Sequence, residues 1–217
     1  MYMNTKLMIA LRDHTADNYL ENQDMKEYFR EQPLGKLALP TGKIIANDPL
    51  CLFETEPFVK SVPPGNYPVM LYIYHCNTDQ RVAFAEIRFS ENMPVKYEPA
   101  ITAEQDAATL ERDEFFGYGV DSGTGCFMDE QACQKLLQLT DDLEDGILPE
   151  FNQKLQKSYI DTYCAANYTL PGIKCNVAAF STGYGDGAYP SYWGYDKSGK
   201  VCCLITDFCI IEEVNAD

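Results

Sequence analysis

NVAAFSTGYGDGAYPSYWGYDKSGKVCCLITDF, residues 176–208, decides the fold, because it holds three apolar runs separated by glycine-rich turns. Val177–Ser181, Tyr189–Tyr195 and Val201–Ile211 are rich in β-branched and aromatic residues, which favour strands. GYGDG and DKSG between them are typical turn sequences, since glycine adopts backbone conformations that other residues avoid. The spacing predicts a β-meander at the C-terminal end.

Two helices are predicted on the N-terminal side of this stretch. Asp129 is a candidate N-cap for a helix that reaches about Leu139. Pro149 begins a second helix through about Tyr163, with proline at the position that helices tolerate best. A short strand, Phe115–Val120, precedes both helices.

Hairpins dominate residues 34–100. Short apolar runs on either side of Thr41-Gly42 predict a first hairpin. Tyr67–Cys76 and Val82–Phe89 predict a second hairpin that is largely buried. Because side chains alternate along a strand, Glu86 is expected to be half-buried or to face solvent, according to which sheet face is covered.

The N-terminal segment, residues 1–33, has a loose helical period that predicts a helix over residues 4–31, ending before Pro33. Strands in adjacent pairs, with two helices grouped between them, indicate an α+β fold. We therefore expect a mainly antiparallel β-sheet or sandwich of hairpins with two central helices and a C-terminal meander. The 217 residues are expected to form a single domain, in which residues 34–100 supply hairpins and residues 115–217 supply the strand, the helices and the meander.

The composition limits the classes of partner. Seventeen basic and 33 acidic residues give a formal net charge of −16, which phosphate backbones and anionic lipids repel. We therefore expect neither a nucleic-acid nor a membrane partner, while cations and basic proteins are favoured. The nine cysteines lie mostly in apolar runs without a C-x-x-C spacing, which favours reduced core thiols and a cytoplasmic protein.

Aspartates beside glycines suggest a cation site. Asp121 and Asp186 lie in glycine-rich loops, and Asp207 interrupts an apolar strand, where a carboxylate is costly unless it is paired. Carboxylates and loop carbonyls are the ligands that calcium and magnesium prefer, so the three aspartates are candidate metal ligands. The alternative is that Asp121 and Asp186 only cap their own turns.

Aromatic residues gather in the same stretch and suggest a binding surface. Tyr184, Tyr189, Tyr192 and Trp193 are interleaved with glycine and proline, and Asp186 lies among them. Such rings combine a large apolar area with a polar tip, as contact surfaces do. Packing in the core is the alternative use of the same residues.

No motif in the sequence indicates a particular catalytic reaction. The two histidines are His14 and His75, and His75 and its neighbour Cys76 point to opposite faces of a strand. The chain has no nucleophile elbow, phosphate loop or dinucleotide fingerprint. Hydrolysis by paired carboxylates stays open, because Glu86, Asp121, Asp186 and Asp207 could meet in space.

Two long segments carry a family resemblance. FGYGVDSGTGCFMDE (116–130) and FSTGYGDGAYPSYWGYDKSGKVCCLITDF (180–208) resemble a bacterial family known as domain-of-unknown-function family 4241. The pieces LGKLALPTGKIIANDPL (34–50) and PPGNYPV (63–69) are also similar to it. The resemblance covers the chain from about Leu34 onward and implies no particular reaction.

We therefore expect a non-catalytic, acidic binding module that engages a basic protein partner, in the manner of immunity or adaptor proteins. The alternative is a hydrolase or lyase that depends on a divalent metal held by the aspartates.

Overall fold

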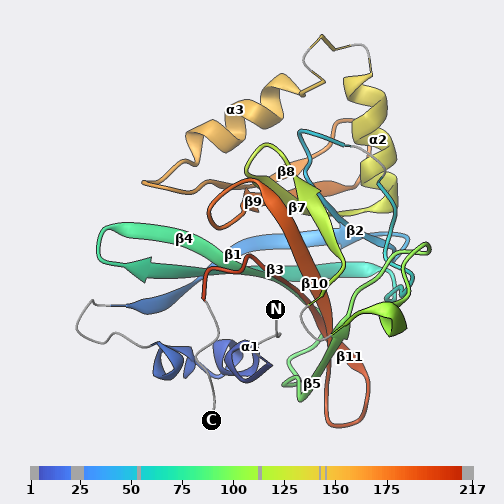
Figure 1. Ribbon diagram of the computed structural model, residues 1–217. Coiled ribbons are helices and arrows are strands. Elements are labelled where there is room, and N and C mark those ends of the chain that lie inside the picture. The colour runs from blue at the N-terminus through green and yellow to red at the C-terminus, as the bar shows by residue number, and fades with distance from the viewer. Residues whose placement is uncertain are drawn as a thin grey trace.

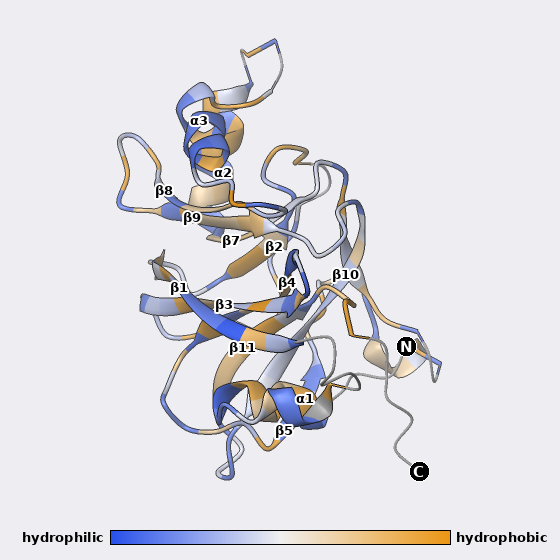
Figure 2. Cartoon of the chain, turned by 90° about the vertical axis from the view of Figure 1, so that its left-hand side faces the viewer, coloured by the Kyte–Doolittle hydropathy of each residue, from blue (hydrophilic) through white to orange (hydrophobic). Residues whose placement is uncertain are grey.

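The fold has four layers. A computed structural model describes residues 5–20, 27–52, 55–111, 114–141, 143–144 and 146–211. A helical pair, a four-stranded sheet, a seven-stranded sheet and the N-terminal helix lie one above the other (Figure 1), and the same stack is visible from the side (Figure 2). Every strand pairing between described residues is antiparallel. The predicted α+β fold with an antiparallel sandwich is confirmed.

The larger sheet has the strand order β1-β3-β4-β11-β10-β5, with β6 paired to β10 outside this path. Its strands are β1 (Tyr28–Leu39), β3 (Gly65–Cys76), β4 (Asp79–Arg88), β5 (Lys96–Pro99), β6 (Gly117–Val120), β10 (Gly187–Tyr195) and β11 (Val201–Asp207). The predicted hairpin between β3 and β4 is confirmed, and so is the pairing of the last two strands, β10 and β11.

The smaller sheet has the order β2-β7-β9-β8. Its strands are β2 (Ile44–Asn47), β7 (Thr124–Asp129), β8 (Ala165–Thr169) and β9 (Asn176–Ser181). Side chains alternate along β7, so that Cys126 and Met128 pack toward the helical pair while Phe127 packs toward the larger sheet. With both faces covered, such strands read as unbroken apolar runs. The sequence analysis missed β7 and β8.

Two helices, α2 (Glu130–Thr140) and α3 (Pro149–Lys157), cover the outer face of the smaller sheet (Figure 1). Asp129 caps α2 as predicted, because its carboxylate accepts a hydrogen bond from the Gln131 N–H at 2.9 Å. Pro149 begins α3, also as predicted. The helix ends six residues before Tyr163, since Ile160 and Tyr163 form a bridge that turns the chain toward β8.

The prediction of a helix over residues 4–31 is wrong in its second half. A short helix, α1, spans Thr5–Arg12, and a single turn of 3-10 helix spans Ala16–Tyr19. Residues 21–26 lie outside the described residues, and β1 begins at Tyr28. The strand continues past Pro33 because the register shifts there and β1 is an edge strand, where a missing N–H is tolerated.

The predicted hairpin around Thr41-Gly42 is also wrong. β1 pairs with β3 in the larger sheet, whereas β2 pairs with β7 in the smaller one. The turn at Gly42, with φ +73°, therefore passes the chain between sheets rather than back along one. The predicted three-stranded C-terminal meander is wrong in its first strand for the same reason. β9 lies in the smaller sheet, and only β10 and β11 are neighbours in the larger one.

The helix α1 covers the outer face of the larger sheet (Figure 1). Leu7, Met8 and Leu11 are buried there. A further turn of 3-10 helix, Ala107–Thr109, precedes β6. Among the helices of the described residues, none is long and apolar enough to cross a membrane.

Candidate functional site

A cavity of about 1250 Å³ lies where β6 and the start of β10 meet the loop that follows β2. The segment around Ala100–Gln105 closes another wall. Its volume is somewhat above the range of about 300–1,000 Å³ that is typical of pockets for small ligands. This cavity is the candidate site.

The lining of the cavity is acidic. Five carboxylates line it, from Asp48, Glu56, Glu104, Asp121 and Asp186. Among the described residues of its wall, none is lysine, arginine or histidine. Carboxylates brought together without basic partners repel one another and favour a cation between them.

Asp48 is the one member of this group with a structural role. Its buried carboxylate accepts hydrogen bonds from the Leu50 and Cys51 N–H groups at 2.9 and 3.2 Å. It also accepts bonds from the N–H groups of Asp121 and Ser122, at 3.0 and 2.7 Å, and from the Ser122 hydroxyl at 2.8 Å. Asp48 therefore fixes the loop after β6 against the loop after β2.

Asp121 and Asp186, two of the candidate ligands, both line the cavity. Their two glycine loops touch, because the Thr182 N–H donates to the Gly123 carbonyl at 3.1 Å. Both carboxylates, with Glu56 and Glu104, are exposed, and among described residues none of the four accepts a hydrogen bond or forms an ion pair. The alternative that Asp121 and Asp186 cap their own turns is therefore wrong.

The Cys51 thiol lines the same cavity and is affected by these carboxylates. Burial, followed by the carboxylates of Asp48, Asp121 and Asp186, raises the pKa of the Cys51 thiol. The thiol is therefore held in its protonated form at neutral pH, which is the less nucleophilic form.

Asp207 does not join the other two aspartates. It lies half-buried at the end of β11, where its carboxylate accepts a hydrogen bond from the Cys209 N–H at 2.8 Å. It does not line the cavity. No group of three His, Cys, Asp or Glu side chains within the described ranges is placed to hold a metal ion. The structure therefore does not assemble Asp121, Asp186 and Asp207 as ligands of one calcium or magnesium ion.

Burial raises the pKa of Asp207 to about 7, although the hydrogen bond from Cys209 opposes this shift. Since the folded-state pKa exceeds the unfolded value of about 4, stability contributed by the protonated group is lost as the pH rises from about 4 to 7. We expect Asp207→Asn to raise the free energy of unfolding by about 2 kcal/mol at pH 8 and by less at pH 5. Urea titrations at both pH values measure this, and an equal offset at both would contradict it.

The predicted aromatic surface is largely buried. Trp193 is 1% exposed, and its ring lies 6.1 Å from that of Phe58 and 6.0 Å from that of Phe89. Tyr192 is also buried, on the opposite face of β10. For these two residues the alternative of core packing is correct, because Phe58 and Phe89 pack on the face of β10 that carries Trp193, and the face that carries Tyr192 is covered as well.

The other two predicted tyrosines differ in their position relative to the cavity. Tyr189 lines the cavity, and its hydroxyl donates to the Gly185 carbonyl at 2.7 Å, which fixes the turn that carries Asp186. Tyr184 is 69% exposed and lies outside the cavity, with the Arg81 guanidinium 5.3 Å from its ring centre. Of the predicted binding residues, Asp186 and Tyr189 therefore reach the candidate site.

Glu56, Glu104 and β6 were missed by the sequence analysis as parts of a site. Glu56 follows the loop after β2, and Glu104 lies between β5 and β6, far from the glycine-rich stretch in sequence. For Glu56 and Glu104 the only indication in the sequence was the surplus of acidic residues, and composition does not identify which carboxylates share a cavity.

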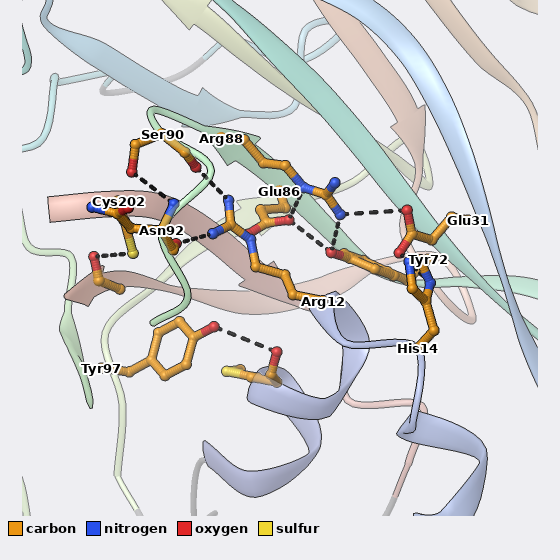
Figure 3. Close-up of polar contacts among 12 residues, drawn as sticks. Arg12, His14, Glu31, Tyr72, Glu86, Arg88, Ser90, Asn92, Tyr97 and Cys202 are labelled. Atoms are coloured by element: carbon orange, nitrogen blue, oxygen red, sulfur yellow. Dashed lines mark hydrogen bonds and ion pairs between the residues drawn. The ribbon is translucent and has the colours of Figure 1, made fainter. Parts of the chain in front are cut away.

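A second charged cluster lies between α1 and the larger sheet (Figure 3). Glu86 is fully buried, contrary to expectation, because α1 covers this face. Its carboxylate pairs with Arg12 at 2.7 Å and Arg88 at 2.8 Å, and it accepts a hydrogen bond from the Tyr72 hydroxyl at 2.7 Å. Glu86 is therefore committed to holding α1 and is not available to the cavity.

The histidines are also remote from the cavity. His75 is buried and stacks on Tyr28 with ring centres 4.3 Å apart, and burial followed by the charge of Arg30 lowers its pKa. The imidazole of His14 lies 3.2 Å from Glu31 beside α1 (Figure 3). Neither histidine lines the cavity wall.

Comparison with known proteins gives a family and no characterised relative. No curated protein and no solved structure matches the chain. Residues 37–206, most of the chain, match the family model described as "Protein of unknown function (DUF4241)". The matched range includes the whole of β6, β10 and the loop that carries Asp48, and so the frame of the cavity. The chain is therefore a member of the DUF4241 family.

Proposed function

We propose that this protein is a non-catalytic binding module that receives cationic groups of a basic protein partner in its acidic cavity. The observation that carries the proposal is the lining of the cavity, with five carboxylates and, among its described residues, no basic side chain. Four of those carboxylates are exposed to an incoming group. A cationic partner relieves their mutual repulsion on binding.

Charge at long range favours the same class of partner. A net charge of −16 attracts basic proteins during diffusional encounter and repels nucleic acids and anionic membranes. Phe58, Phe116 and Tyr118 also line the cavity, and aromatic faces attract guanidinium and ammonium groups. Arginine and lysine side chains thus match both the charge and the aromatic part of the wall.

The groups at the cavity support a binding role more than a catalytic one. Its thiol, Cys51, is held protonated by burial and by the neighbouring carboxylates. Both histidines are engaged elsewhere, His75 with Tyr28 and His14 with Glu31. We further propose a cytoplasmic location, which agrees with nine cysteines that are all free thiols.

The proposal predicts that Asp121→Asn combined with Asp186→Asn weakens binding of a fluorescent hexa-arginine peptide at least tenfold, a loss of about 1.4 kcal/mol. The cause is the removal of two unpaired carboxylates from one wall of the cavity. Fluorescence anisotropy at about 0.15 M salt measures the effect.

The matched control is Asp141→Asn combined with Glu144→Gln, which removes the same charge at exposed positions beyond α2. Equal weakening by both double variants would contradict the proposal, since net charge alone would then explain binding. If calcium or magnesium instead raised the melting temperature, and the cavity variant abolished that rise, the metal-dependent alternative would replace the proposal.

A further inference from the structure

The strand β6 presents its edge to the cavity. Six consecutive residues, Phe116–Asp121, line the wall. Successive side chains of a strand point to opposite faces, so a cavity over one face would meet mainly alternate side chains. A continuous run indicates that the backbone edge of the strand faces the cavity.

The register with β10 identifies which backbone groups are open. Gly117 lies opposite Pro190, which has no N–H, so this is a pair without mutual hydrogen bonds. Hydrogen-bonded and non-bonded pairs alternate, and therefore Gly119, opposite Ala188, is also in a non-bonded position. Gly117 and Gly119 direct their N–H and C=O groups away from β10.

The N–H group of Asp121, on the same side of the chain as those of Gly117 and Gly119, shows what this edge of β6 faces. Asp121, two residues after Gly119, donates its N–H to the carboxylate of Asp48 at 3.0 Å. Groups two residues apart on a strand point the same way, so the open groups of Gly119 lie toward the same side of the cavity. In the part of the chain that the structure describes, no backbone group outside the pairing with β10 bonds to residues 117–120.

This edge is accessible at its two glycines. Gly117 and Gly119 are exposed, and a Cβ atom added at Gly119 would meet no atom within 4 Å. Carboxylates flank it, because Val120 pairs with Gly187 and so Asp121 and Asp186 continue the two strands at the same end. The site therefore combines a free strand edge with negative charge.

We propose that an extended segment of a partner protein, carrying arginine or lysine side chains, adds to β6 as a new strand and places those side chains among the carboxylates of the cavity. Strand addition supplies affinity through backbone hydrogen bonds, and the surrounding side chains select the sequence. The inference rests on the proposed function, and it names the form in which the basic partner binds.

The test uses a labelled decapeptide of alternating arginine and threonine and three counterparts. One carries citrulline, a neutral analogue, in place of arginine; one is N-methylated at every arginine amide; one is N-methylated at every threonine amide. An added strand turns only one of these two amide sets toward β6. We expect citrulline and one of the methylated peptides to lose affinity at least tenfold, while the other methylated peptide binds within threefold of the parent.

Variants of the protein give a second, independent measurement. Gly119→Pro removes the open N–H, whereas the control Gly119→Ala keeps it and adds a side chain in open space. Of the two variants, we expect only Gly119→Pro to bind the parent peptide tenfold more weakly than the unaltered protein does. Arginine amide has too little backbone to form a strand, so we expect it to bind the unaltered protein and both variants with the same affinity.

The outcomes separate the two proposals. Equal binding of the parent and citrulline peptides would overturn the proposed function. Binding that depends on arginine but treats both methylated peptides alike would overturn strand addition alone. The peptide comparison uses the unaltered protein, so it decides the matter even if Gly119→Pro does not fold.

Discussion

Replacing Glu86 with alanine is expected to lower the free energy of unfolding by about 3–5 kcal/mol, which is the cost of leaving a buried charge without its partner. Two guanidinium groups depend on this carboxylate. The Arg12 Nε lies 2.7 Å from it and the Arg88 Nε lies 2.8 Å from it, and the side chain of Arg12 is 4% exposed. Without Glu86, the buried Arg12 keeps only the backbone carbonyls of Ser90 and Asn92 as acceptors. Arg88 keeps its longer ion pair with Glu31 at 3.4 Å, and the Tyr72 hydroxyl loses its acceptor (Figure 3).

Urea titration followed by the fluorescence of Trp193, the single tryptophan, measures this change. The matched control is Glu98→Ala, which breaks the exposed pair of Glu98 with Lys96, also at 2.7 Å, and is expected to cost under ~1 kcal/mol. A similar small loss in both variants would contradict a structural role for the buried cluster.

Arg12 provides a further check on the same cluster. Removing both charges together, by Arg12→Met and Glu86→Leu, leaves no buried guanidinium at position 12 that has lost Glu86. The double variant is therefore expected to lose less stability than the sum of the two single variants. Additive losses would show that the two side chains act independently.

The second large effect is expected at Gly42, where alanine should cost more than 3 kcal/mol and reduce the yield of folded protein. Its φ of +73° is a left-handed conformation that β-carbon-bearing residues avoid. The added Cβ atom would also lie 1.8 Å from the carbonyl oxygen of Val62. That carbonyl belongs to a residue whose N–H donates to the Gly42 carbonyl at 2.9 Å, so neither chain can move without losing the contact.

Gly172→Ala separates the two causes. Gly172 has a similar φ of +79°, but a Cβ atom there would meet nothing within 4 Å. We expect that variant to lose only about 1 kcal/mol, the cost of the backbone conformation. The melting temperatures and soluble yields of the two variants measure the difference, and equal losses would show that the clash at Gly42 is relieved.

The position of Gly42 explains why the effect is large. It is the point at which the chain leaves β1 in the larger sheet and enters β2 in the smaller one. Distortion there separates two layers of the sandwich rather than widening one surface turn. The sequence marked a turn at Thr41-Gly42 but not its role, because a hairpin and a crossover between sheets both need a turn.

Local chemistry was read correctly from the sequence. Asp129 as the cap of α2, Pro149 at the start of α3 and the pairing of β3 with β4 depend on residues close together in the chain. Their energies come from single hydrogen bonds, one fixed dihedral angle and one short turn. The sequence offered Asp121, Asp186 and Asp207 together as candidate ligands, and the first two line the cavity while Asp207 does not.

The sequence by itself determined the family, the antiparallel α+β fold and the excess of negative charge. Only the tertiary structure decided which sheet each strand joins, that Trp193 and Glu86 are buried, and that Glu56 and Glu104 share a cavity with Asp121 and Asp186. The physical reason is that strand patterns specify which residues face a covered surface, not what covers it. Here α1 buries Glu86, and Phe58 and Phe89 cover Trp193, through contacts between residues far apart in the chain.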